Sequence, residues 1–331
     1  MGKAEPTDPA PPPPGELLLA ERTRSDIAIL FERSAFEGGF LLVGPEGQGK
    51  ARLAQTLAGD ILSGASELGG GSQNVRQQIA AGAHPDYCVL TRTENDKTGK
   101  LRSEIDVDAA RSVISRLQQT SVSGKRVVIV DLADDLGRSA ANSLLKVLEE
   151  PPRGTCFFLL SRSPSRLLPT LVSRCRRLVL RPVPDDTIAE WLVASSSVGR
   201  EDAQRLAAAS GGAPGRAWAL ASDDRQGPLG IAEALLEAAD NGGDLLAAAR
   251  PFGAKDQERA AEEAAEIVLT NLRQRAVGGT GQAQGFALAA YDEARLIFVS
   301  AGTADRTQTA LMAGLAIRRC LAGKNPPPKV A

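Results

Sequence analysis

The residues with the clearest chemical potential lie in a glycine-rich loop near the beginning of the chain. Gly44, Gly47, Gly49 and Lys50 occupy the positions expected in a phosphate-binding loop, after an apolar run and before a helical pattern. Backbone N–H groups of such a loop bind phosphate oxygens, and its lysine pairs with the β- and γ-phosphates. The motif continues with Ser or Thr, whose hydroxyl binds Mg²⁺, but this chain has Ala51. We therefore predict a degenerate ATP site; a turn that binds nothing is the alternative interpretation.

A second candidate group follows an apolar run that ends in Asp131. This arrangement is typical of the strand whose terminal aspartate holds Mg²⁺ in nucleotide-hydrolysing proteins. Hydrolysing proteins of this kind carry a glutamate at the next position, where it polarises the attacking water, and here that position is Leu132. The alternative is that Asp131 has no function, because strands commonly end in an acidic residue. Because Ala51 and Leu132 remove the metal ligand and the base together, we expect ATP turnover to fall by orders of magnitude.

A third candidate is Arg174, in the tripeptide Ser-Arg-Cys. One interpretation is a surface arginine in an ion pair. The other is an arginine finger, which stabilises charge on the γ-phosphate of a nucleotide bound by a neighbouring subunit. The acidic pair Glu149 and Glu150 ends a predicted helix. Adjacent residues on a helix do not face each other, so we interpret both carboxylates as solvent or interface charges.

These candidates need a scaffold of alternating strands and helices. Continuous apolar runs predict buried parallel strands, and apolar residues at helical spacing predict the helices between them. The predicted strands are 40–43, 87–90, 127–130, 156–160 and 178–180. The predicted helices include 50–62, 139–149 and one capped by Asp106. The alternation predicts a doubly wound α/β fold with a parallel sheet.

Composition changes along the chain predict its domains. The proline-rich beginning cannot bury apolar area, and β-like runs largely stop after residue 182. We predict a disordered tail at 1–16, an α/β domain at 17–181, a helical lid domain at 182–225, an all-α domain at 226–323 and a tail at 324–331.

Composition also excludes several function classes. Aromatic residues make up 4% of the chain, which argues against base stacking as the main activity. The formal net charge is -1, which argues against nucleic-acid binding through an overall positive charge. The four cysteines are widely spread, and no pair of them has the close spacing of a zinc site, so we predict no zinc site. No apolar run reaches the length of a membrane span. We predict a cytoplasmic protein with no membrane partner.

Several ordered segments carry a family resemblance: His84–Asp86, Asn142–Pro152, Phe158–Leu160 and Leu171–Cys175. They are similar to segments of the bacterial clamp-loader AAA+ proteins, the tau/gamma and delta-prime subunits of DNA polymerase III. The resemblance covers about residues 20–222. It implies an AAA+ α/β domain, a lid domain and an all-α collar through which the subunits form an oligomer. Many family members also bind zinc through four cysteines in the segment that corresponds to residues 51–83, which contain no cysteine in this chain.

The missing groups indicate which type of member the chain resembles. The motor subunits carry an intact phosphate loop and an Asp-Glu pair, whereas this chain has Ala51 and Leu132. It therefore resembles the delta-prime type, a stator without its own ATPase activity. The resemblance implies that Arg174 completes the ATP site of an adjacent motor subunit and that Ser161 stands at the sensor-1 position. The implied partners are tau/gamma and delta subunits and, indirectly, the sliding clamp and primed DNA during replication.

Two other readings of the sequence stay open. One is an active AAA+ ATPase, either a tau/gamma-like motor or a Holliday-junction motor, which Ala51 and Leu132 argue against. The other is a P-loop kinase. That reading lacks an identifiable base and lid arginine, and it leaves the helical C-terminal part unexplained.

Overall fold

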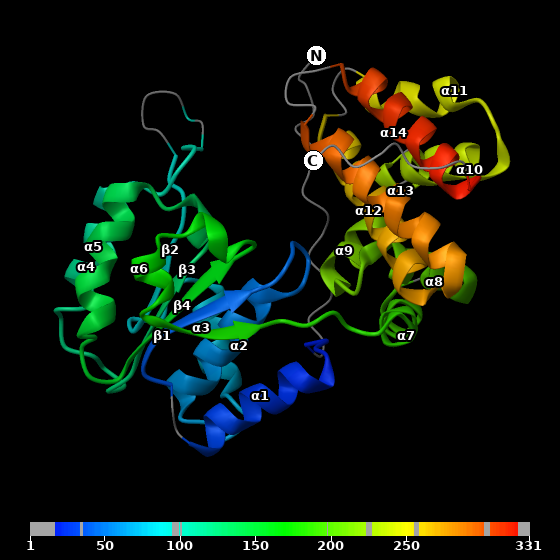
Figure 1. The fold of residues 1–331 in the computed structure, drawn as a ribbon. Coiled ribbons are helices and arrows are strands. Elements are labelled where there is room, and N and C mark those ends of the chain that lie inside the picture. Colours follow the sequence, from blue (N-terminus) through cyan, green and yellow to red (C-terminus); the bar gives the residue numbers. More distant parts are fainter. Residues whose placement is uncertain are drawn as a thin grey trace, which may run out of the picture. The chain divides into compact units, whose positions relative to one another are not determined.

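The computed structural model describes residues 17–33, 36–94, 99, 101–196, 198–222, 227–254, 258–300 and 305–323. These residues form two compact units, one within Gly15–Val183 and one within Pro184–Ala331. The first is α/β and the second is built from helices (Figure 1). The predicted tails at 1–16 and 324–331, and the predicted boundary at 225–226, lie outside the described residues. The division of the helical unit into lid and collar stays a prediction.

The α/β unit contains a five-stranded sheet in the order β2-β3-β4-β1-β5. The strands are β1 (Gly38–Val43), β2 (Tyr87–Leu90), β3 (Arg126–Val130), β4 (Thr155–Ser161) and β5 (Cys175–Val179). All neighbouring strands pair in parallel. Every residue of the central strand β4 is buried, as expected for a parallel strand covered on both faces. The predicted parallel α/β fold is confirmed.

Helices cover both faces of this sheet. One apolar cluster joins α1 (Glu21–Glu32), α2 (Lys50–Ser63) and α3 (Gln73–Ala80) to residues such as Phe40 and Phe158. The other joins α4 (Val107–Arg116), α5 (Arg138–Glu149) and α6 (Pro169–Val172) to Leu41 and Phe157. Neighbouring residues of one strand therefore enter opposite clusters, because successive side chains of a strand point to opposite faces.

The last strand differs from its prediction. The expected strand 178–180 is wrong at both ends, since β5 covers Cys175–Val179 and excludes Leu180. Parallel pairing with β1 begins at Gly39 with Cys175 and ends at Val43 with Val179. Arg176 and Arg177 are exposed within this edge strand, so they interrupt the apolar run without interrupting the backbone pairing.

The glycine-rich segment between α2 and α3 is organised around a carboxylate. Asp60 is fully buried, and its oxygens accept hydrogen bonds from the backbone N–H groups of Gly69 and Gly71, both at 2.8 Å. Arg76 forms an ion pair with the same carboxylate at 3.3 Å. A Cβ atom on Gly71 would lie 2.8 Å from Asp60 Oδ1, so the close approach of the backbone requires glycine there.

The helical unit contains no strand within its described residues. Its helices are α7 (Asp185–Ser195), α8 (Arg200–Ser210), α9 (Pro214–Ala221), α10 (Pro228–Asn241), α11 (Leu245–Ala249), α12 (Glu258–Gly278), α13 (Gly281–Ser300) and α14 (Arg306–Leu321). The rings of Trp191 and Trp218, 5.6 Å apart, join α7 to α9. Among the helices described in either unit, none combines the length and the apolar character needed to cross a bilayer. The predicted cytoplasmic location stays a prediction.

Candidate functional site

The glycine-rich loop lies between β1 and α2, at the carboxyl end of the parallel strands. Gly47 and Gly49 have φ values of 74° and 86°, a backbone region that favours glycine. Gly49 is the N-cap of α2, and the N–H of Gly44 donates to the carbonyl of Ser161 at 3.2 Å. The loop therefore sits at a helix N-terminus, where free N–H groups favour a phosphate.

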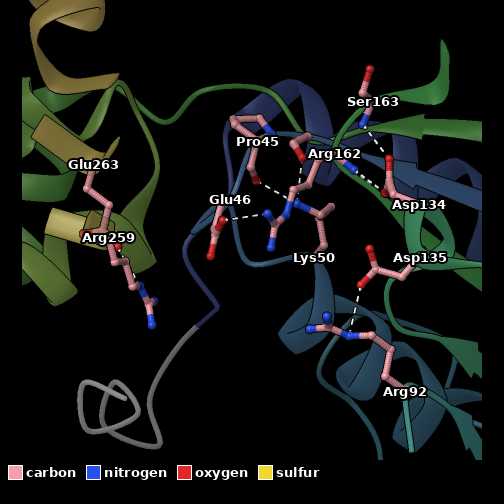
Figure 2. A network of polar contacts seen from close by, with 11 residues as sticks. Pro45, Glu46, Lys50, Arg92, Asp134, Asp135, Arg162, Ser163, Arg259 and Glu263 are labelled. Atoms are coloured by element: carbon pink, nitrogen blue, oxygen red, sulfur yellow. Dashed lines mark hydrogen bonds and ion pairs between the residues drawn. The ribbon is translucent and has the colours of Figure 1, made fainter. Parts of the chain in front are cut away.

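Lys50 is turned back onto its own loop (Figure 2). Its buried Nζ donates hydrogen bonds to the carbonyl oxygens of Gly44 and Pro45 at 2.6 and 2.7 Å. Arg162, which follows β4, forms an ion pair with Glu46 of the loop at 3.1 Å. A phosphate that binds here must compete with loop carbonyls for the lysine and with Glu46 for the guanidinium.

Burial, and after it the positive charge of Arg162, lower the pKa of Lys50 from 10.5 to about 8. Glu46, Asp134 and Asp131 act in the opposite direction. Because the folded value lies below the unfolded one, the unfolded chain binds more protons at this group between about pH 8 and 10.5. This lysine therefore makes the folded state more stable as the pH rises through that window.

We expect Arg162→Ala to raise the pKa of Lys50 above about 8, because removal of a nearby positive charge favours the ammonium form. NMR titration of the labelled lysine side chain measures this value. Arg166→Ala is the control, since Arg166 is exposed and does not contribute to the lowered pKa. An unchanged titration of Lys50 in Arg162→Ala contradicts the assigned cause.

Asp131 directly follows β3 and lies within electrostatic reach of Lys50. Burial raises its pKa above the ordinary value, while Lys50 and Arg162 oppose the change. Leu132 packs partly against the apolar cluster that holds α2, and Ala51 is exposed at the beginning of α2. At both positions the side chain offers neither a metal ligand nor a base.

Ser161 ends β4 beside the loop, since it pairs with Val43 of β1. Its hydroxyl donates to Asp134 at 3.1 Å. The same carboxylate accepts from the backbone N–H groups of Arg162 and Ser163 at 2.9 and 3.1 Å. Asp134 therefore fixes the end of β4 and the direction of the serine hydroxyl.

The structure brings most of the predicted site residues together. These are Gly44, Gly47, Gly49, Lys50, Asp131 and Ser161. Sequence reasoning missed Glu46, Asp134 and Arg162, which lie beside them (Figure 2). Two of them could have been found from their places in the sequence. Asp134 comes three residues after Asp131, and Arg162 directly follows Ser161.

Arg174 lies apart from this group, at the other end of β1. The next residue, Cys175, pairs with Gly39 near the beginning of β1, whereas the loop starts after Val43. Gly44 follows Gly39 by five positions of extended backbone, which corresponds to about 16 Å at the usual rise. Arg174 is therefore not positioned to contact a phosphate in the chain's own loop.

A side chain of α5 and a backbone carbonyl of α6 hold the Arg174 guanidinium in place. Its Nε donates to Glu149 Oε1 at 2.8 Å, and one terminal nitrogen forms an ion pair with the same oxygen. The other terminal nitrogen donates to the carbonyl oxygen of Thr170 at 2.9 Å. Glu149 was interpreted from the sequence as a solvent or interface charge; in the structure it is the ion-pair partner of Arg174.

Comparison with known proteins places the α/β unit in a family. Residues 21–184 match the family model described as DNA polymerase III, delta subunit. The DNA polymerase III subunit delta' of Pseudomonas aeruginosa is 38% identical over 187 residues, which cover 55% of this chain and 55% of that protein. The Escherichia coli subunit delta' is 40% identical over 149 residues, covering 45% and 43%. The chain spans about half the length of these curated relatives.

Similarity to a tau subunit is weaker. The Escherichia coli DNA polymerase III subunit tau is 27% identical over 156 residues, covering 46% of this chain and 23% of that protein. Among solved structures, a DNA polymerase III gamma subunit-related protein from Thermotoga maritima aligns over 90% of this chain and 98% of that chain. Its identity is 18% and its TM-score 0.37, too low to support an argument. By sequence, residues 21–184, which make up most of the α/β unit, belong to the family of the DNA polymerase III delta' subunits.

Proposed function

We propose that this chain is a delta-prime-type subunit of a bacterial clamp loader. It assembles with tau/gamma and delta subunits, and the assembly uses ATP to place a sliding clamp on primed DNA. The chain does not hydrolyse ATP; it supplies Arg174 to the ATP site of an adjacent motor subunit. The similarity to delta' subunits supports this assignment, and so does the helical unit, where we place the collar through which the subunits associate.

The observation that carries the proposal is the separation of Arg174 from the phosphate loop along β1. An arginine finger must reach the γ-phosphate to stabilise the charge that develops there. Arg174 is at the wrong end of β1 for its own loop, and the site around that loop lacks the hydroxyl at position 51 and the carboxylate at position 132 that hydrolysis needs. A finger that cannot act on its own chain is suited to act on a neighbour.

Reconstitution tests this proposal. The purified chain is mixed with tau/gamma and delta subunits, and the products are separated by size-exclusion chromatography with light scattering. We expect one hetero-oligomer that contains this chain, and clamp loading on primed DNA that requires it. Elution of the chain by itself, together with clamp loading at full rate in its absence, would refute the proposed function.

A further inference from the structure

The ion pair between Glu149 and Arg174 joins two elements at the end where the finger must act. Glu149 is the last residue of α5, and Arg174 follows α6 directly. A carboxylate at a helix C-terminus is placed unfavourably, because the partial negative charge of the helix dipole repels it. The helix itself therefore gains nothing from Glu149, and the contact that compensates this carboxylate is Arg174.

The contacts constrain the guanidinium plane from two sides. Glu149 Oε1 accepts from Nε and from one terminal nitrogen, and the carbonyl oxygen of Thr170 accepts from the other terminal nitrogen. The Arg174 side chain is 30% exposed, so the group is neither sealed in the core nor free in solvent. These hydrogen bonds restrict the rotamers of a flexible arginine side chain before a ligand arrives.

The pair is too weak to withhold the arginine from a phosphate. The carboxylate of Glu149 is 47% exposed, and ion pairs between partly exposed groups contribute little because water screens them. A triphosphate carries more negative charge than one carboxylate and accepts bidentate hydrogen bonds from arginine. The consequence of the pair is therefore orientation rather than inhibition.

We infer that Glu149 is a positioning residue for Arg174: it holds the guanidinium ready to meet the γ-phosphate of a nucleoside triphosphate bound by the adjacent subunit. This inference rests on the proposed function. Glu149 does not itself touch the nucleotide. It affects phosphoryl transfer in the adjacent subunit through the position of Arg174. A side chain ordered beforehand loses less freedom in the transition state, so Glu149 raises the rate rather than the affinity for ATP.

The test measures ATP hydrolysis by the reconstituted complex under saturating concentrations of this chain. We expect Glu149→Ala to lower kcat about threefold at the motor site that receives Arg174, the scale of a partly exposed ion pair, with KM for ATP unchanged. Glu149→Gln keeps a neutral acceptor oxygen and should recover part of the loss. Glu150→Ala is the matched control, since Glu150 is the adjacent exposed carboxylate, and it should leave kcat unchanged.

The double variant, Glu149→Ala with Arg174→Ala, distinguishes failure of this inference from failure of the proposed function. If Glu149 acts through Arg174, Glu149→Ala has no further effect in the Arg174→Ala background. An equal loss in that background shows a structural role and overturns the inference, and so does an unchanged kcat in the single variant Glu149→Ala. Loss of activity in Arg174→Ala with none in Glu149→Ala leaves the proposed function standing. No loss in Arg174→Ala removes the proposed function itself.

Discussion

Replacing Arg174 by alanine should slow ATP hydrolysis by about 10³-fold or more at the motor site that receives this residue, the lower end of the effect of an arginine finger. The reconstituted complex should therefore lose the whole contribution of that site to phosphate release. Assembly should not change, because Arg174 is a partly exposed side chain whose ion-pair partner Glu149 is also partly exposed. Steady-state phosphate release by the purified complex, with its subunit composition checked by chromatography, measures the effect.

Two variants show whether the loss is specific. Arg174→Lys should not restore hydrolysis, because lysine keeps the charge but lacks the planar fork that meets a phosphate bidentately. Arg177→Ala removes an exposed arginine of the neighbouring strand β5 and should leave phosphate release unchanged. Equal rates for Arg174→Ala and the unmodified complex would remove the finger assignment.

Much of the α/β unit could be predicted, because its apolar runs and helix caps in the sequence coincide with strands and helix ends in the structure. The strand at Tyr87–Leu90 has the predicted bounds, and Asp106 caps α4 by accepting from the N–H of Ala109 at 2.8 Å. The error at β5 has a different origin. Edge strands depend on backbone pairing with a neighbour, and the exposed Arg176 and Arg177 hide that pairing from a search for apolar runs.

The candidate site was predictable only where a motif defines it. Lys50 and Asp131 belong to recognisable patterns, and the parallel register of β1 and β4 brings Ser161 beside them. The partners of these residues come from elsewhere in the fold. Glu149 lies 25 residues before Arg174 in the sequence, and no helical or strand period connects the two. Such contacts follow from tertiary packing, which a single sequence does not display.

The same reasoning predicts a second large effect, the absence of ATP turnover in the isolated chain. Hydrolysis requires a metal held near the β- and γ-phosphates and a group that positions the attacking water. Ala51 and Leu132 supply neither, and Lys50 is engaged by the carbonyl oxygens of Gly44 and Pro45. The losses act on different parts of one transition state, so we expect turnover lower than that of a motor subunit by at least about 10³-fold.

Phosphate release from ATP and Mg²⁺ by the purified chain alone is the most direct test of the account. We predict a rate no higher than that of Lys50→Ala, a variant that removes the chain's own loop lysine and so reports any contaminating activity. A tau/gamma subunit measured in parallel shows that the assay detects a working motor. Sustained magnesium-dependent release that disappears in Lys50→Ala would mean that this chain is a motor, and would contradict the account.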